Sequence, residues 1–121
     1  MLPAPNRLRT RSDFTSAVRG RGSVRAGSRL LVVHATRTDA RAGLPPRVGF
    51  VVSRAVGGAV VRNRVKRRLR ALVSARVGSV PSGVDLVVRA NPATATLTSA
   101  ELATALEPLW DKVIGRLEVV R

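Results

Sequence analysis

The hydrophobic pattern of the chain switches between two periods. Apolar residues three or four positions apart indicate amphipathic helices, and short runs rich in β-branched residues indicate strands. Glycine and proline clusters separate these segments. In chain order, the predicted segments are a helix at 12–19, extended segments at 23–25, 29–36 and 47–53, a helix from Gly57 and Gly58 to about 77, a strand at 84–89 and a last helix from about 98.

Three helix signals refine this pattern. Ser12 and Asp13 are predicted to start the first helix, because a short polar side chain accepts hydrogen bonds from free backbone N–H groups. Thr98 and Glu101 have the spacing of a capping box at the start of the last helix. Pro108 lacks a backbone N–H, so we expect a kink or a restart of the last helix at this position.

The order of these elements predicts an α+β fold. The sequence α-β-β-β-α-β-α is typical of a two-layer sandwich in which helices pack on one mixed sheet. The third strand, the second helix and the fourth strand form a β-α-β unit, for which the general rule predicts a right-handed crossover. The chain 1–121 has the length of one domain, and we expect its ends, 1–6 and 116–121, to be flexible.

The second helix combines an apolar stripe with a dense positive surface. Its apolar positions at helical spacing are Val61, Val65, Leu69, Leu72 and Val73. The opposite face presents Asn63, Lys66, Arg67 and Arg70, with Arg62, Arg64 and Arg68 along the flanks. Charge runs on helices are usually solvated faces that mix both signs. No acidic residue occurs between Arg41 and Val84, so this charge is costly unless a polyanion neutralises it.

The charge of the whole chain points to the same kind of partner. Its 22 Lys and Arg against 7 Asp and Glu give a net charge of +15. Residues 1–76 hold 18 basic and 2 acidic side chains, whereas residues 77–121 hold 4 and 5. This asymmetry favours a phosphate-rich partner. As the polyanionic partner, nucleic acid is a better candidate than a membrane surface, because the sequence shows no lipid anchor and no amphipathic helix with aromatic anchors.

Catalysis by protein side chains is poorly supported. His34 is the sole histidine, cysteine is absent, and the few carboxylates are scattered, so we predict no catalytic residue and no protein metal site. Absence of cysteine fits a reducing compartment, and no apolar segment is long enough to span a membrane, so we expect a cytoplasmic protein. Gly57 and Gly58 precede a helix and either hold a phosphate through backbone N–H groups or simply turn the chain.

The aromatic content narrows the mode of nucleic-acid contact. The chain has no tyrosine, and its large aromatic side chains are Phe14, Phe50 and Trp110. An aromatic stacking platform is therefore not expected, and recognition is predicted to rest on phosphate contacts and shape. Phe50 and Trp110 occupy apolar-periodic positions, so we assign both to the core.

Several segments resemble one protein family. They are Asn6-Arg7-Leu8-Arg9, Asp13-Phe14, Arg47-Val-Gly-Phe-Val-Val-Ser-Arg54 and Gly57-Gly-Ala-Val-Val-Arg-Asn-Arg-Val-Lys-Arg-Arg-Leu-Arg70. In this order they resemble the bacterial ribonuclease P protein component, over roughly 5–115, and Arg62-Asn63-Arg64 resembles the signature of that family. The chain departs from the family at Val18, where members often have a second aromatic residue.

The resemblance implies a protein subunit of a ribozyme, with a ribosomal S5 domain 2-like fold and a left-handed β-α-β crossover. In that family the catalytic subunit is RNA, Mg²⁺ is bound mainly by the RNA, and the holoenzyme removes the 5′ leader from precursor tRNA. The partners implied are the catalytic RNA and precursor tRNA, with no membrane and no protein partner required. RNA contact is implied for Arg62, Asn63, Arg64, Lys66, Arg67, Arg68, Arg70, Gly57 and Gly58, and a leader cleft for Phe14, Arg7 and Arg9.

Two other classes stay open at this point. Folds and charges of this kind are shared with ribosomal and other structural RNA-binding proteins. A nuclease that acts without RNA is the second alternative. Reconstitution with the catalytic RNA separates a ribosomal or other structural RNA-binding protein from a ribonuclease P subunit, because only the subunit should raise cleavage of precursor tRNA. Cleavage by the RNA-free chain would support the nuclease.

Overall fold

A mixed sheet organises the part of the chain that the computed structural model describes, which is residues 2, 4–19 and 22–119. The helices are α1 (Arg11–Arg19), α2 (Ala59–Ser74) and α3 (Ser99–Val119), and the strands are β1 (Val24–Gly27), β2 (Leu31–Arg37), β3 (Arg47–Val52) and β4 (Val84–Ala90). Short 3-10 helices are η1 (Ala4–Asn6), η2 (Asp39–Arg41), η3 (Val77–Ser79) and η4 (Pro92–Thr96). The predicted α-β-β-β-α-β-α order is confirmed.

The strands lie in the order β1-β2-β4-β3. β1 pairs with β2 and β2 pairs with β4 in antiparallel fashion, whereas β3 and β4 run parallel. Residues that face each other across this sheet include His34 and Val87, and Val48 and Leu86. The arrangement confirms the mixed sheet of an α+β fold.

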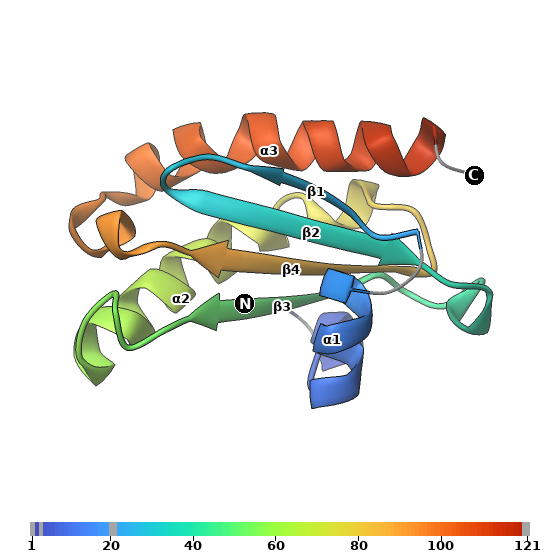
Figure 1. Cartoon of the computed structure of the whole chain (residues 1–121), viewed down its shortest axis with the longest axis horizontal. Coiled ribbons are helices and arrows are strands. Elements are labelled where there is room, and N and C mark those ends of the chain that lie inside the picture. The colour runs from blue at the N-terminus through green and yellow to red at the C-terminus, as the bar shows by residue number, and fades with distance from the viewer. Residues whose placement is uncertain (1, 3, 20–21, 120–121) are drawn as a thin grey trace.

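Alternation along the strands gives the sheet two different faces. Leu31, Val33, Leu86 and Val88 point to the face that α2 and α3 cover, where they are fully buried in the main core with Trp110. The other face carries a smaller apolar cluster beneath α1, built from Leu8, Ala17 and Val87. Figure 1 shows α3 along the length of the sheet and α1 near the start of β3. The period-two pattern of the strands therefore places two cores on opposite sides of one sheet.

The connection from β3 to β4 is a β-α-β unit between neighbouring parallel strands. In Figure 1 both strands point to the left, β4 lies above β3, and α2 returns behind them, on the face opposite α1. This path is left-handed, as the family resemblance implies. The general right-handed rule is wrong for this chain.

Two of the predicted helix ends need correction. α1 begins at Arg11, and the Thr10 hydroxyl accepts a hydrogen bond from the Asp13 backbone N–H at 3.1 Å, so Thr10 caps the helix in place of Ser12 or Asp13. α3 continues through Pro108 without a restart. Pro108 is exposed, so water can solvate the carbonyl that its missing N–H leaves free.

The capping box of α3 is confirmed, and α2 is shorter than predicted. The Thr98 backbone N–H donates to Glu101 Oε1 at 3.0 Å, and the Glu101 N–H donates to Thr98 Oγ1 at 3.1 Å. α2 ends at Ser74, and η3 follows it. In the terminal stretches expected to be flexible, residues 1, 3, 120 and 121 lie outside the described residues, and Leu2 is buried in the main core.

Candidate nucleic-acid interface

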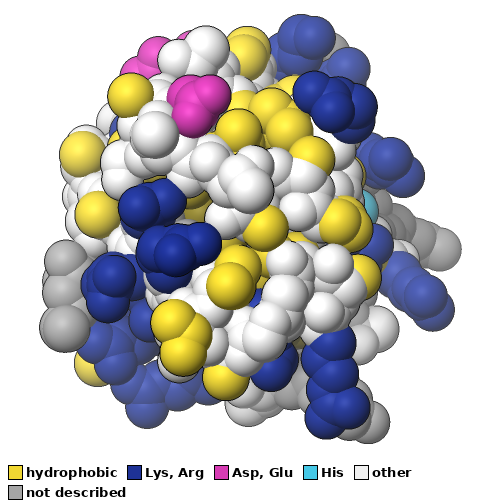
Figure 2. Space-filling model, turned by 90° about the vertical axis from the view of Figure 1, so that its left-hand side faces the viewer, with side chains coloured by type: hydrophobic (Ala, Val, Ile, Leu, Met, Phe, Trp, Pro, Cys, Tyr) yellow, Lys and Arg dark blue, Asp and Glu magenta, His cyan; other side chains and the backbone are white. Residues whose placement is uncertain are grey.

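Positive charge gathers around the end of the molecule where β3 finishes and α2 begins. Figure 2 shows Lys and Arg side chains grouped low on this end and along one edge, while acidic side chains lie at the top, where α3 runs. The described carboxylates that form ion pairs are Asp13, Asp85, Glu107 and Asp111, and their partners are Arg47 and Arg76. Among the described side chains, no ion pair involves a cation of α2.

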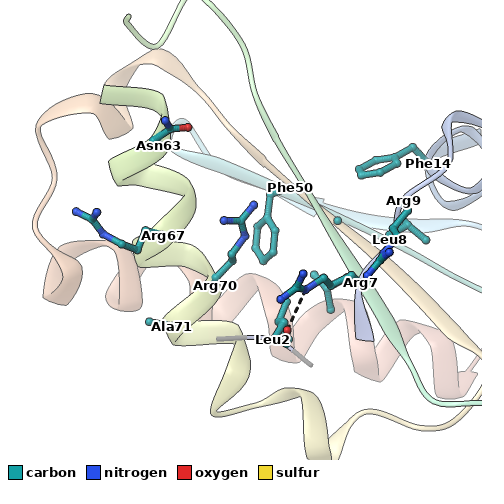
Figure 3. Close-up of a pocket in the computed structure, with 12 residues that line it drawn as sticks. Leu2, Arg7, Leu8, Arg9, Phe14, Phe50, Asn63, Arg67, Arg70 and Ala71 are labelled. Atoms are coloured by element: carbon teal, nitrogen blue, oxygen red, sulfur yellow. Dashed lines mark hydrogen bonds between the residues drawn. The ribbon is translucent and has the colours of Figure 1, made fainter. Parts of the chain in front are cut away.

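A cleft of about 650 Å³ opens between α2, the edge strand β3 and the N-terminal segment. Figure 3 shows how three separate parts of the chain form its walls. Its lining residues are Leu2, Arg7, Leu8, Arg9, Phe14, Val48, Gly49, Phe50, Asn63, Arg67, Arg70 and Ala71. Four of these residues are arginines and none is acidic, so the cleft is a site of positive potential that suits an anionic chain.

The N-terminal segment reaches the cleft by crossing the edge of the sheet. Leu2 lies in the main core on the α2 side, whereas Leu8 lies in the cluster beneath α1. Between them, Arg7 forms a parallel bridge with Val48, and the Leu8 N–H donates to the Val48 carbonyl at 3.0 Å. The Arg7 Nε donates to the Leu2 carbonyl at 3.0 Å. This crossing places Arg7 and Arg9 in the cleft wall, where the resemblance implies a leader cleft.

α2 supplies the opposite wall. Val65, Leu69 and Val73 are buried, which confirms the predicted apolar stripe, and Val61 and Leu72 are half-buried beside it. Side chains three or four residues apart share a helix face, and Asn63, Arg67 and Arg70 all line the cleft. In Figure 3 the Arg70 side chain extends toward Phe50, whereas the Arg67 side chain extends from the other side of α2. The structure brings these three together with Phe14, Arg7 and Arg9.

The other cations of α2 lie outside this group. The Arg64 Nη2 donates to the Ala95 carbonyl at 3.0 Å, and the Arg68 Nη1 donates to the Leu97 carbonyl at 2.6 Å. These bonds tie α2 to the η4 segment, a structural role that the sequence does not indicate. Arg62 and Lys66 are half-buried and do not line the cleft.

The two glycines before α2 differ in their constraints. Gly57 has a φ of 157°, and a Cβ there would lie 2.9 Å from the Val61 side chain. This position therefore favours glycine on steric grounds. Gly58 is the N-cap of α2 and is exposed, with open space where a side chain would be. The geometry supports the turn-forming alternative for Gly57, and phosphate contact at the pair stays a prediction.

The aromatic residues divide differently from the expectation. Trp110 is 2% exposed, which confirms its core assignment. Phe50 is half-buried: it packs against the main core and also lines the cleft, so assigning it to the core alone was wrong. β3 is the edge strand of the sheet, and this leaves one side of the Phe50 ring accessible. Phe14 is half-buried on α1, and Val18 packs in the smaller cluster.

An ion-pair network that the sequence reasoning missed joins α1 to the sheet. The Arg47 Nε and Nη2 donate to the two carboxylate oxygens of Asp85, each at 2.8 Å, and its Nη1 donates to Asp13 Oδ2 at 3.0 Å. Hydrogen bonding to Asp85 raises the pKa of Arg47. The Thr10 hydroxyl and, less strongly, the Arg47 charge lower the pKa of Asp13. A carboxylate in each of two elements within a basic chain is the signal that could have suggested this network.

His34 does not belong to the cleft. It lies in β2 and is 6% exposed, and burial lowers its pKa with a further contribution from Arg89 and Arg25. Within the described residues, no group of three His, Cys, Asp or Glu side chains is placed to hold a metal ion. A cleft lined by arginine also repels a divalent cation. In the described part of the chain, no helix has the length and hydropathy to cross a membrane.

Comparisons with known proteins agree on one family. The family described as Ribonuclease P matches residues 2–114. The ribonuclease P protein component of Beutenbergia cavernae is 62% identical over 102 residues, which cover 84% of this chain and 82% of the relative. That of Streptomyces bikiniensis is 52% identical over 121 residues, with 95% and 97% covered.

Solved structures show the same fold. The RNase P protein of Staphylococcus aureus superposes with a TM-score of 0.76 at 24% identity and covers 90% of this chain and 97% of its own. The RNase P protein of Thermotoga maritima, in complex with 1-(4-fluorophenyl)-2-thiourea, gives a TM-score of 0.70 at 25% identity, with 84% and 94% covered. These likenesses confirm the mixed-sheet α+β architecture.

Proposed function

The chain belongs to the ribonuclease P protein family, whose members are protein components of a ribonucleoprotein endoribonuclease, and from this premise we propose that its cleft holds the single-stranded 5′ leader of precursor tRNA. The observation that carries the proposal is the composition of the cleft. Arg7, Arg9, Arg67 and Arg70 line it without a carboxylate, beside the rings of Phe14 and Phe50. Guanidinium groups neutralise phosphates, and the exposed sides of the rings offer apolar contact to bases.

A second part of the proposal concerns the catalytic RNA. Arg62, Lys66 and the Gly57-Gly58 turn lie outside the cleft, on the same helix and at its start. An RNA that packs against this side would leave the cleft free for the leader. α2 then bridges two polynucleotides, and its charge is neutralised on both sides. This arrangement accounts for the absence of described carboxylate partners along the helix.

The protein's contribution to the reaction follows from these contacts. Phosphodiester hydrolysis requires an activated water and stabilisation of the charge that develops on the phosphate. The cleft residues do not suit a divalent cation, so a Mg²⁺ that activates the water would be held by the RNA subunit. The protein side chains bind and orient the leader, and they lower the repulsion between two RNA chains. Such a subunit works in the cytoplasm, with the catalytic RNA and precursor tRNA as its partners.

Reconstitution tests this function directly. The protein is mixed with the catalytic RNA, and cleavage of precursor tRNA is followed at low Mg²⁺ concentration. We expect the protein to raise cleavage and to bind a substrate with a leader more tightly than one without. A structural RNA-binding protein would raise neither quantity. Cleavage by the protein alone, after nuclease treatment to remove RNA, would instead establish a nuclease that acts without RNA.

A further inference from the structure

Two neighbouring positions on one face of β3 hold two consecutive residues of α1. Arg47 and Gly49 point to the same side of the sheet, because side chains alternate along a strand. Arg47 pairs with Asp13, and a Cβ on Gly49 would overlap the ring of Phe14. The ring therefore lies directly against the backbone of the strand at Gly49.

Asp85 holds the Arg47 side chain in a fixed orientation. Its guanidinium makes a two-bond contact with Asp85, which is on the neighbouring strand, and the Asp85 side chain is 6% exposed. Such a planar, two-bond pair fixes orientation as well as distance. The remaining nitrogen, Nη1, donates to Asp13 on α1, so the position of that helix is fixed relative to β3 and β4.

We propose that Arg47 and Gly49 are positioning residues that set Phe14 at the wall of the cleft, where its ring meets a base of the bound single strand. The inference rests on the proposed leader-binding function. Arg47 fixes α1 through Asp13, and the missing side chain at Gly49 gives the ring its place. A longer side chain at that position displaces Phe14 from the cleft wall, although it adds no charge and removes none.

Gly49→Ala is the sharpest test, read in the reconstituted holoenzyme as the ratio of dissociation constants for substrates without and with a leader. Loss of one base–aromatic contact in Phe14→Ala should lower this ratio by about tenfold. We expect Gly49→Ala to lower it similarly and to cause no further loss in the Phe14→Ala background. An unchanged ratio in Gly49→Ala, or additive losses, would show that Gly49 does not act through Phe14.

Asp13→Asn tests the ion pair between Arg47 and Asp13 and leaves the pair between Arg47 and Asp85 in place. Its matched control is Glu107→Gln, which removes the same charge from the exposed pair with Arg76. Both variants should strengthen binding to any RNA slightly, but Asp13→Asn alone should lower the leader ratio, by about threefold. Equal ratios in the two variants would contradict a positioning role for Arg47.

A readout without RNA separates this inference from the proposed function. The chain has 2 phenylalanines, so fluorine labelling of phenylalanine gives two resonances, which Phe14→Leu assigns. We expect the Phe14 resonance to shift in Gly49→Ala and Asp13→Asn and to stay in place in Glu107→Gln. A shift without any change in the leader ratio would leave positioning intact and overturn leader binding at this ring. A fixed resonance would overturn the positioning itself.

Discussion

The arginines of α2 and the arginines elsewhere in the fold meet their surroundings in different ways. Arg67 and Arg70 line the cleft with no described carboxylate paired to them. Arg47 is held by Asp13 and Asp85, and Arg76 by Glu107 and Asp111. The paired cations contribute to folding, whereas the cleft cations keep their donors available for a polyanion. Partnering, more than position in the charge run, separates the two classes.

A third class lies between these two on the same helix. Arg64 and Arg68 have no carboxylate partner, but they donate to the carbonyls of Ala95 and Leu97. Such bonds use one N–H group and leave the charge in place. These two arginines are therefore expected to contribute more to stability and less to RNA affinity than Arg67 and Arg70.

The largest expected effect is loss of RNA affinity on removing the cleft cations. Each of Arg67→Ala and Arg70→Ala should flatten the dependence of log affinity on log salt by about one unit, and the double variant by about two. Unfolding free energies should change by less than about 0.5 kcal/mol, because these side chains are exposed. Binding of a precursor tRNA with a leader to the reconstituted holoenzyme, across a salt series, measures the slopes.

Lys112→Ala provides the control for this pair. Lys112 is exposed on α3, outside the cleft, and its removal changes the net charge by the same amount. We expect its salt slope to match that of the unaltered protein. A loss of affinity in Arg67→Ala with an unchanged slope would mean that the helix contacts RNA through something other than phosphate neutralisation.

The next effect concerns the bonds from α2 to η4. Arg68→Ala leaves the Leu97 carbonyl without its charged donor, at a part-buried position. We expect a loss of about 1–2 kcal/mol in unfolding free energy, and about 1 kcal/mol for Arg64→Ala. Urea unfolding measures both. Salt slopes that fall by a full unit, with stability unchanged, would place Arg64 and Arg68 in the same class as Arg67.

These three classes of arginine also show which structural features can be predicted from the sequence and which cannot. Helical spacing predicts that Val65, Leu69 and Val73 are buried and that Asn63, Arg67 and Arg70 share a face, because both follow from local geometry. The carbonyl partners of Arg64 and Arg68 lie 31 and 29 residues away. Long-range contacts of this kind depend on how separate elements pack, and no local pattern encodes them.

The distinction between local pattern and long-range packing also explains the other differences between the predicted and the observed structure. The period-two pattern of β3 predicts that the Phe50 side chain faces the core. Its exposure to the cleft depends on β3 being an edge strand. Sheet order and crossover handedness are global properties that a local pattern leaves open. The resemblance supplied the handedness, because a family pattern carries information about the whole fold. The Arg47 network was missed since its two carboxylates come from α1 and β4.

A smaller effect is expected from acid on the Arg47 network. Because the pKa of Asp13 in the folded chain is lowered, its ionised form stabilises the fold above the ordinary pKa of aspartate. That contribution is lost as pH falls through the lowered value. Unfolding free energy measured from pH 5 down to pH 2 should therefore decline less steeply in Asp13→Asn than in the unaltered chain.

Glu101→Gln distinguishes this network from general acid sensitivity. Its carboxylate also has a lowered pKa, caused first by the Thr98 backbone N–H, but it caps α3 away from the cleft. The Glu101→Gln variant should make the decline of unfolding free energy with falling pH less steep, without changing the fluorine resonance of Phe14. Parallel acid curves for Asp13→Asn and the unaltered protein would show that the pair with Arg47 adds nothing to stability.

The smallest expected effect is at the exposed pairs of Arg76. Glu107 and Asp111 are 58% and 71% exposed, and such pairs contribute about 0–1 kcal/mol each. In Glu107→Gln/Asp111→Asn, Arg76 becomes as unpaired as the cleft arginines, and unfolding free energy in urea should fall by about 0–2 kcal/mol for the two pairs together. The salt slope for RNA binding should stay the same, because Arg76 precedes η3 after the end of α2 and belongs neither to the cleft lining nor to the Arg62 and Lys66 side that is proposed to meet the catalytic RNA. A slope that steepens by a full unit would mean that free charge alone, without the shape of the cleft, determines where RNA binds.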